Sequence, residues 1–150
     1  MLDEVYDYLH DYGFTAIDLD KIEKKNDEIF DASREDVKKI TTFLEEKYLD
    51  QGEVIDVINS NPFMLTERNN RLEALDDIYC GELAIDYESL ANLIKTNPMT
   101  YTASPIELQK NIDYLIEKGY NISTIRKFIL DNSQVINMKS DDFVKVLKIN

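Results

Sequence analysis

Apolar residues recur along this chain at helical spacing, and the pattern returns about every 35 residues. A polar residue closes each short apolar stretch. These polar residues are Asn26, Asn61 and Asn97, with Ser133 in the fourth place, at spacings of 35, 36 and 36 residues. Apolar residues stand four and seven positions before them, which puts both on one face of a helix. The pattern therefore predicts a helix that ends at each of these positions.

The fourth copy departs from this pattern at one position. Earlier copies have Leu19, Val54 and Leu90 seven residues before the closing polar residue, whereas counting back from Ser133 gives Arg126. We expect this side chain either to reach a binding groove or to lay its apolar stem over the core while its charge stays in water.

A second, longer apolar ladder precedes the first in each copy. The residues 4, 7, 10 and 11 positions after Ser33, Arg68 and Ser104 are mostly apolar, and Val144 and Leu147 follow Ser140 in the same way. The chain start carries the same pattern from Leu2. Each copy is therefore predicted to contain a longer helix, a short loop, a second helix and a tight turn.

Residues that start and stop helices stand at matching places. Ser33, Ser140 and Asn69 are predicted to cap long helices. Ser104 and Glu107 are predicted to form a capping box. Glycines and prolines that end helices follow the predicted stretches, at Gly13, Gly119, Pro62 and Pro98.

Matched columns, caps and stops at one shared period distinguish a repeat from an ordinary helical bundle. One such copy cannot bury its apolar face alone, so neighbouring copies must stack. We predict an all-α, right-handed-type α-solenoid forming a single domain over residues 1–150. It contains about four helix-turn-helix-3₁₀ repeats of ~35 residues, approximately at 1–32, 33–67, 68–103 and 104–139, and a C-terminal capping helix at 140–150.

The composition is that of a globular protein, with 43% hydrophobic and 31% charged residues among 150. The acidic start lacks the basic region and apolar run of a signal peptide, and the sequence contains no apolar run long enough for a membrane span. We expect a soluble, cytoplasmic protein. Cys80 is the only cysteine, which rules out an internal disulfide, and we expect it to be a small core residue.

Acidic residues outnumber basic ones by 30 to 17, which gives a net charge of -13. The surplus is uneven: residues 1–75 carry -10, residues 76–104 carry -4, and residues 105–150 carry +1. The first two thirds of the chain would repel a phosphate backbone, and only the last third would tolerate one.

The residues needed for catalysis are sparse. His10 is the only histidine, no cysteine pair exists to bind zinc, and the four glycines are isolated from one another. Neighbouring carboxylates are expected by chance among 30 acidic residues and are interpreted as solvated helix faces. We therefore expect no enzymatic activity, no metal and no cofactor.

Two kinds of short motif in the repeat resemble those of the mitochondrial transcription termination factor (mTERF) family. One is a proline-apolar opening of the 3₁₀ turn, in residues 61–65 and 97–101. The other is a Gly-aromatic junction between helices, in residues 9–14 and 115–120. The resemblance covers nearly the whole chain and implies helical repeats that curve around double-stranded nucleic acid with basic residues. Tetratricopeptide repeats, of similar period, rank second.

Charge and resemblance lead to two hypotheses about function. The first is a non-enzymatic interaction module that binds a basic protein surface, in its narrower form a phage-type inhibitor that mimics nucleic acid. Its candidate residues are Asp18, Asp20, Asp27, Asp76, Asp77, Glu82, Asp86 and Glu88. Tyrosines outside the core columns, such as Tyr6, Tyr12, Tyr48 and Tyr87, are further candidates for binding anchors.

The alternative is an mTERF-like regulator that binds double-stranded DNA or RNA through its C-terminal third. The candidate phosphate contacts are Lys110, Lys118, Arg126, Lys127, Lys139 and Lys145. Neither hypothesis involves a membrane.

Overall fold

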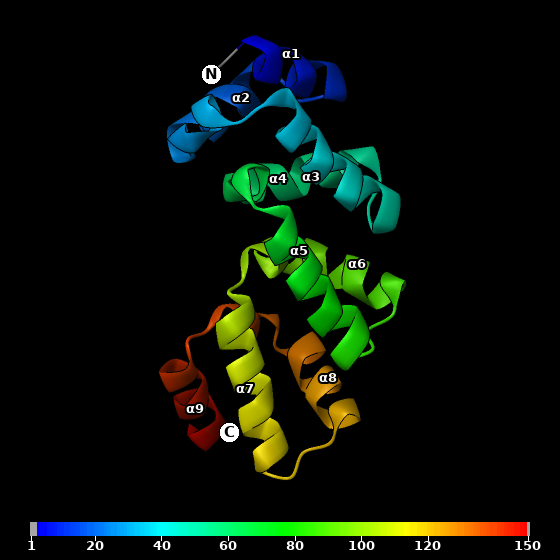
Figure 1. The fold of residues 1–150 in the computed structure, drawn as a ribbon, viewed down its shortest axis with the longest axis vertical. Coiled ribbons are helices and arrows are strands. Elements are labelled where there is room, and N and C mark those ends of the chain that lie inside the picture. Colours follow the sequence, from blue (N-terminus) through cyan, green and yellow to red (C-terminus); the bar gives the residue numbers. More distant parts are fainter. Residues whose placement is uncertain (1–2, 150) are drawn as a thin grey trace. The chain divides into compact units, whose positions relative to one another are not determined.

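All regular secondary structure in the part of the chain that the structure describes is helical. The computed structural model (Figure 1) describes the backbone of residues 3–149, and the side chains of these except residues 3, 30, 148 and 149. In chain order the elements are α1 (Asp3–Tyr12), α2 (Ala16–Lys25), η1 (Asp27–Asp31), α3 (Arg34–Lys47), α4 (Gln51–Ser60), η2 (Pro62–Thr66), α5 (Asn69–Asp76), η3 (Asp77–Glu82), α6 (Tyr87–Thr96), η4 (Thr100–Thr102), α7 (Pro105–Glu117), α8 (Ile122–Asp131), η5 (Ser133–Asn137) and α9 (Ser140–Ile149). This confirms the all-α class.

The order of these elements follows the predicted repeat. Two helices and a 3₁₀ turn succeed one another along the chain, and α9 follows the last turn. With η3 counted as part of α5, the first helix of each pair is the longer one except in the first repeat, where α1 and α2 have 10 residues each. We call α1, α3, α5 with η3, α7 and α9 the A helices, and α2, α4, α6 and α8 the B helices. The handedness of the solenoid, the number of stacked repeats and the single domain over 1–150 stay predictions. Leu2 lies outside the described residues.

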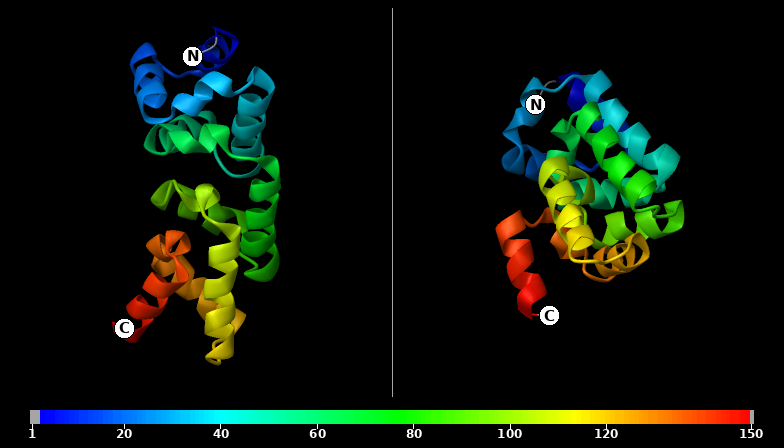
Figure 2. Two further views of the ribbon diagram at one scale, coloured as in Figure 1. Left: turned by 60° about the vertical axis from the view of Figure 1, so that its left-hand side comes forward. Right: turned by 60° about the horizontal axis from the view of Figure 1, so that its bottom comes forward.

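The chain divides into two compact units. Unit 1 comprises Met1–Asn69 and unit 2 comprises Asn70–Asn150. Within unit 1, α1 packs against both α2 and α3, and α3 packs against η2. Within unit 2, α7 lies between α8 and α9 and contacts both (Figure 1). Figure 2 shows the helical hairpins of each unit from two further directions.

The loop between the A and B helices is built around a glycine at two places. In unit 1, Gly13 has φ +134°, and the next residue, Phe14, donates its N–H to Leu9 O at 3.0 Å. In unit 2, Gly119 has φ +96°, and Tyr120 N–H bonds to Leu115 O at 3.1 Å. These are helix ends of the Schellman type, in which the positive φ favours glycine. The predicted helix ends are confirmed.

Each B helix ends at an asparagine, and the fourth of these differs from the prediction. Asn26, Asn61 and Asn97 are the C-cap residues of α2, α4 and α6, as predicted. The C-cap of α8 is Asn132, and Ser133 begins the following 3₁₀ turn, so the placement of Ser133 was wrong by one residue. The third interval, from Asn97 to Asn132, is therefore 35 residues.

The shift by one residue also changes the interpretation of Arg126. Counting back seven positions from Asn132 gives Ile125, which is 1% exposed and completes the buried column. Arg126 lies beside that column rather than in it, so the core of α8 is uninterrupted. The last A helix shifts in the same direction: Phe143 is buried, whereas the predicted Val144 and Leu147 are half-buried.

The single interval of 36 residues has a physical cause in unit 2. Residues 77–82 form a π-helix, in which one extra residue widens the turn. As a result Ile85 N–H bonds to Tyr79 O, six residues back, whereas Phe14 in unit 1 bonds five residues back. Ala84, with φ +52°, takes the place that glycine takes elsewhere. Cys80, predicted as a core residue, is half-buried in this segment.

The predicted caps are confirmed in part. The Ser33 hydroxyl accepts the N–H of Asp36, as expected of an N-cap. Asn69 and Ser140 are the first residues of α5 and α9 rather than their caps. Ser104 accepts from Glu107 N–H, but the Glu107 carboxylate accepts from the Ser140 hydroxyl at 2.9 Å instead of closing a capping box.

The closing asparagines join each repeat to the next within both units. In unit 1 the buried Asn26 donates through Nδ2 to Pro62 O at 3.0 Å and to Thr66 Oγ1 at 3.1 Å. In unit 2 Asn97 Nδ2 donates to Ser133 O at 3.0 Å and to Asn137 Oδ1 at 2.8 Å. Both asparagines therefore bond to the 3₁₀ turn of the following repeat at the same sequence offsets.

Candidate interaction surfaces

A groove lies between α1 and the start of α3 in unit 1. It has a volume of about 470 Å³ and is lined by Glu4, Asp7, Tyr8, Asp11, Tyr12 and Arg34. The three acidic residues are spaced by three and four positions on α1, so they share one helix face, and all three are exposed. The groove therefore has an acidic wall on α1 and two tyrosines between that wall and α3.

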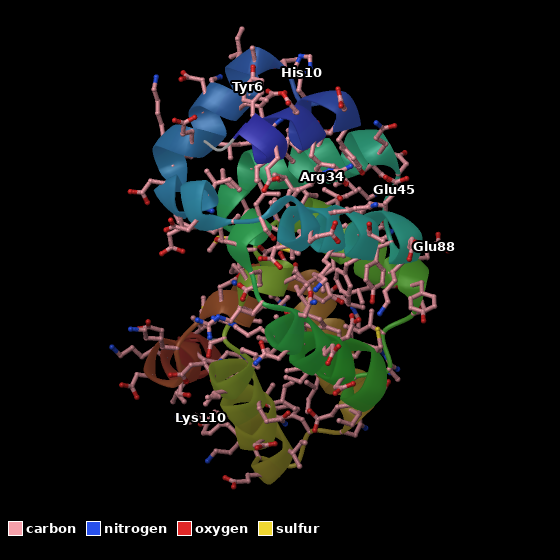
Figure 3. All side chains as sticks on the ribbon, turned by 45° about the horizontal axis from the view of Figure 1, so that its top comes forward. Tyr6, His10, Arg34, Glu45, Glu88 and Lys110 are labelled. Carbon is pink, nitrogen blue, oxygen red and sulfur yellow. The ribbon has the colours of Figure 1, made fainter. Side chains whose placement is uncertain are left out.

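Both tyrosines of this groove are held by hydrogen bonds to α3. The hydroxyls of Tyr8 and Thr41 lie 2.6 Å apart, and the Tyr12 hydroxyl donates to Glu45 Oε1 at 2.5 Å. Partial burial and the bond to Glu45 raise the pKa of Tyr12, so its hydroxyl stays protonated and remains a donor. Figure 3 shows Glu45 on α3.

One cation already occupies the groove. The Arg34 guanidinium carbon lies 5.7 Å from the centroid of the Tyr8 ring, within the range of a cation–π contact. Figure 3 shows Arg34 on α3, while Tyr6 and His10 lie on the side of α1 away from α3. Those two rings are stacked at 6.1 Å, and His10 is exposed. His10 is therefore not part of the groove.

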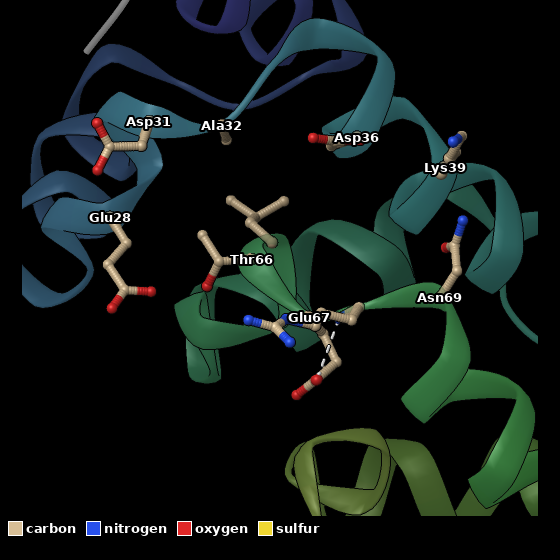
Figure 4. A pocket seen from close by; sticks show the side chains of 10 residues that line it. Glu28, Asp31, Ala32, Asp36, Lys39, Thr66, Glu67 and Asn69 are labelled. Atoms are coloured by element: carbon tan, nitrogen blue, oxygen red, sulfur yellow. Dashed lines mark hydrogen bonds between the residues drawn. The ribbon is translucent and has the colours of Figure 1, made fainter.

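A second groove lies between η1, the start of α3 and the end of η2 (Figure 4). Its volume is about 460 Å³, and its charged residues are Glu28, Asp31, Asp36 and Glu67 with Lys39 and Arg68. Figure 4 shows the hydrogen bond between Glu67 and the N–H of Arg68. Acidic and basic side chains are interspersed here, whereas the acids of the first groove share one face of α1.

Several acidic residues predicted for protein binding have structural partners. Asp18 and Asp86 hold the first turns of α2 and α6: Asp18 closes a capping box with Thr15, and Asp86 accepts from Ser89 N–H at 2.7 Å. The N–H bonds lower the pKa of both carboxyls. Asp20 pairs with Lys24 at 2.9 Å on an exposed helix face.

The remaining predicted acids fall into two groups. Asp76 accepts a 2.5 Å bond from the Tyr101 hydroxyl, and Glu82 accepts a 2.9 Å bond from the Gln109 amide. Asp27, Asp77 and Glu88 are exposed, and Figure 3 shows Glu88 on α6. The predicted acids thus lie on separate elements of both units, and their role in partner binding stays a prediction.

The predicted phosphate contacts are spread over α7, α8, α9 and the adjoining loops. Arg126 donates through Nη1 to Leu83 O at 2.9 Å, and Lys127 pairs with Asp131 at 2.6 Å. Lys118 lies over the Tyr114 ring at 5.4 Å. Lys110, Lys139 and Lys145 are exposed. Their role in nucleic-acid binding also stays a prediction.

A hollow of about 520 Å³ in unit 2 combines members of both predicted sets. It lies between the α5–η3 segment and α7, and Asp77 and Lys110 both line it. Figure 3 shows Lys110 on α7. Asp113 is the only other charged residue of its lining, so the lining of this hollow carries a net charge of -1.

Most of the net negative charge of the chain lies on the A helices. From the sequence, α1 carries -4, α5 with η3 carries -3, α7 carries -2, and α3 and α9 are neutral. The four B helices together carry only -1, and the short η1 carries -3. Exposed carboxylates are therefore most concentrated at the N-terminal end of unit 1.

The acidic wall was missed by reasoning from the sequence. Glu4, Asp7 and Asp11 were not among the predicted residues. The signal was available: α1 contains four acidic residues, no lysine or arginine, and acids at helical spacing. Of the predicted tyrosine anchors, Tyr87 is exposed, whereas Tyr6, Tyr12 and Tyr48 are half-buried.

The described residues also bear on metal binding and membranes. Within residues 3–149, no group of three or more His, Cys, Asp or Glu side chains is arranged to hold a metal ion. In the same range, no helix combines the length and the apolar character that crossing a bilayer requires.

These features define an all-helical repeat protein with an acidic groove in unit 1 and scattered basic residues in unit 2. The mTERF family model matches residues 37–148, and the chain belongs to this family. The family consists of helical-repeat proteins that usually bind nucleic acid and are generally not enzymes. No curated protein matches this chain.

Proposed function

We propose that this chain is a non-enzymatic interaction module that binds a basic protein surface. The observation that supports the proposal is the location of its charge. Unit 1 carries a net -10, α1 alone holds -4 of it, and the carboxylates of Glu4, Asp7 and Asp11 are exposed beside a groove. Such a surface attracts basic partners and speeds their encounter.

The same charge disfavours nucleic acid as the partner of unit 1. Proteins that bind duplexes neutralise phosphates with lysine and arginine, and a surface of net -10 repels them. Membership of a nucleic-acid-binding family therefore supports the repeat architecture more directly than it supports the ligand. In the narrower form of the proposal, the acidic surface occupies the nucleic-acid channel of a basic protein.

The test of this proposal is the salt dependence of binding to a basic probe. We expect a labelled arginine-rich peptide to bind the whole chain at 50 mM NaCl and to lose about tenfold or more in affinity by 500 mM, because salt screens the attraction. Binding that does not change with salt would contradict the proposal. For the narrower form, the chain should compete with duplex DNA for a DNA-binding protein.

A second candidate function is duplex binding through residues 105–150. Two observations favour it: the family match covers this segment, and the segment carries +1. If the six predicted basic residues all contact phosphates, the slope of log K against log salt should be about -5. An electrophoretic mobility shift at low salt tests this directly, and the absence of any shift would rule the candidate out.

A further inference from the structure

We propose that the groove between α1 and α3 binds an arginine-rich segment of a partner protein, with arginine side chains lying on Tyr8 and Tyr12. This inference rests on the proposed function and deepens it, because it names both the site and the residue type that the site prefers. Three features of the groove support it.

The first feature is the uncompensated charge of the α1 wall. Glu4, Asp7 and Asp11 line the groove, and Arg34 is the only basic residue of its lining. The lining therefore carries a net charge of -2. Because the three carboxylates share one helix face, an extended or helical segment lying along α1 can meet all of them in turn.

The second feature is the pair of tyrosines beside that wall. Tyr8 and Tyr12 stand one helical turn apart on α1, with ring centroids 6.2 Å apart. Their hydroxyls are tied to Thr41 and Glu45 on α3, which orients both rings before any partner arrives. Both tyrosines line the groove, and oriented tyrosine rings suit guanidinium groups, which stack on aromatic rings better than ammonium groups do.

The third feature is the position of Arg34. Its guanidinium lies over the Tyr8 ring at 5.7 Å, so this ring holds an arginine, and a partner arginine on the same face of the ring must displace Arg34. The charge of α1 argues against a second α1, from another copy of this chain, as the occupant, because it would bring four more acidic residues to the acidic wall. The occupant is therefore a basic segment of another protein.

The experiment compares two labelled peptides of equal charge, one with five arginines alternating with alanine and one with five lysines. We expect the whole chain to prefer the arginine peptide by about threefold or more, since the aromatic contact discriminates between the two cations. The Tyr8→Leu variant should lose this preference, whereas Tyr8→Phe, which keeps the ring, should retain it. Far-UV circular dichroism confirms that each variant is folded.

A matched pair of triple variants tests the acidic wall. Glu4→Gln, Asp7→Asn and Asp11→Asn together should lower affinity for the arginine peptide about tenfold. The control changes three exposed acids of unit 1 outside the groove, Glu28→Gln, Glu46→Gln and Asp56→Asn, and should lower it by less than about threefold.

The outcomes separate this inference from the proposed function. Equal losses in the two triple variants would overturn the groove and leave diffuse attraction to the acidic surface. Retention of the arginine preference in Tyr8→Leu would overturn the role of the tyrosine. If the unmodified chain binds neither peptide at low salt, the proposed function fails and the groove fails with it.

Discussion

Unit 1 carries 18 acidic and 8 basic residues, whereas unit 2 carries 12 and 9, and yet both are built with the same local devices. In each unit a glycine with positive φ ends an A helix, and an asparagine bonds to the next 3₁₀ turn. The shared devices are mostly buried or at helix ends, and the charge difference is on exposed faces. Architecture and surface chemistry have therefore varied separately in this chain.

The two units also differ in regularity. The repeats of unit 1 follow one another at 35 residues, while unit 2 contains one additional residue, which the π-helix of residues 77–82 absorbs. Because the extra residue is taken up before the B helix begins, α6 presents the same buried positions as α4. A repeat can thus accept an insertion without moving its core.

The largest effect on stability should come from substitutions of leucine in the hydrophobic core of each unit. Leu44 in unit 1 and Leu75 in unit 2 are both fully buried. We expect Leu44→Ala and Leu75→Ala each to lower the free energy of unfolding by ~2–5 kcal/mol, measured by chemical denaturation. Asp77→Ala, on the exposed side of the unit 2 core, is the control and should be nearly neutral. An equal cost for Asp77→Ala would mean that the register is wrong.

The bonds between repeats offer a finer comparison. Asn26 is 1% exposed, whereas Asn97 is half-buried. We expect Asn26→Ala to lower the free energy of unfolding by about 1–3 kcal/mol and Asn97→Ala by less, because a carbonyl left without its donor costs more when it is buried. Asn92→Ala, on the exposed face of α6, serves as the control. A larger loss of unfolding free energy for Asn97→Ala than for Asn26→Ala would show that burial does not determine the cost of losing this bond.

The two glycines differ in their surroundings. A Cβ added to Gly13 would lie 2.9 Å from Ile55 Cδ1, whereas one added to Gly119 would have nothing within 4 Å. Both have positive φ, so each alanine should cost about 1–3 kcal/mol of backbone strain, with Gly13→Ala at the upper end. Thermal unfolding of the two variants side by side measures the difference, and equal costs would show that Ile55 moves aside freely.

The smallest effect concerns the helix caps of Asp18 and Asp86. The pKa of each carboxyl is lowered in the folded chain, so each contributes stability above the ordinary aspartate pKa of about 3.9 and loses it as the pH falls through the lowered value. We expect Asp18→Asn and Asp86→Asn to flatten the acid limb of the stability curve slightly. Urea denaturation between about pH 2 and pH 6 would reveal it, with Asp77→Asn as the control.

Much of the fold could be predicted because burial and helix ends follow local rules. Ser33, Gly13 and Gly119 act as their residue types suggest, and the asparagine column identified three of the B-helix ends. The fourth B-helix end was predicted one residue too late, because Asn132 and Ser133 are both typical helix-end residues and a spacing of 36 residues from Asn97, equal to the interval before it, selects Ser133. A π-helix has no strong sequence signal, so the extra residue in this turn could not be predicted from the sequence.

The candidate surfaces were harder to predict than the fold. A carboxylate that caps a helix, such as Asp18 or Asp86, looks the same in the sequence as one that faces a partner. In the sequence Arg126 interrupts the column counted back from Ser133, but in the structure it lies beside the column and bonds to a loop carbonyl, Leu83 O. The groove on α1 depends on which side of the helix meets α3, and that is decided by packing between helices distant in sequence.

The forward direction of the asparagine bonds has a consequence for synthesis on the ribosome. Asn26 donates to Pro62, which is made 36 residues later, so the end of the first helical hairpin has no acceptor when it emerges. The same delay separates Asn97 from Ser133. These two hairpins therefore leave the exit tunnel before the turns that they bond to, and co-translational folding of each should be completed only when its turn has been made.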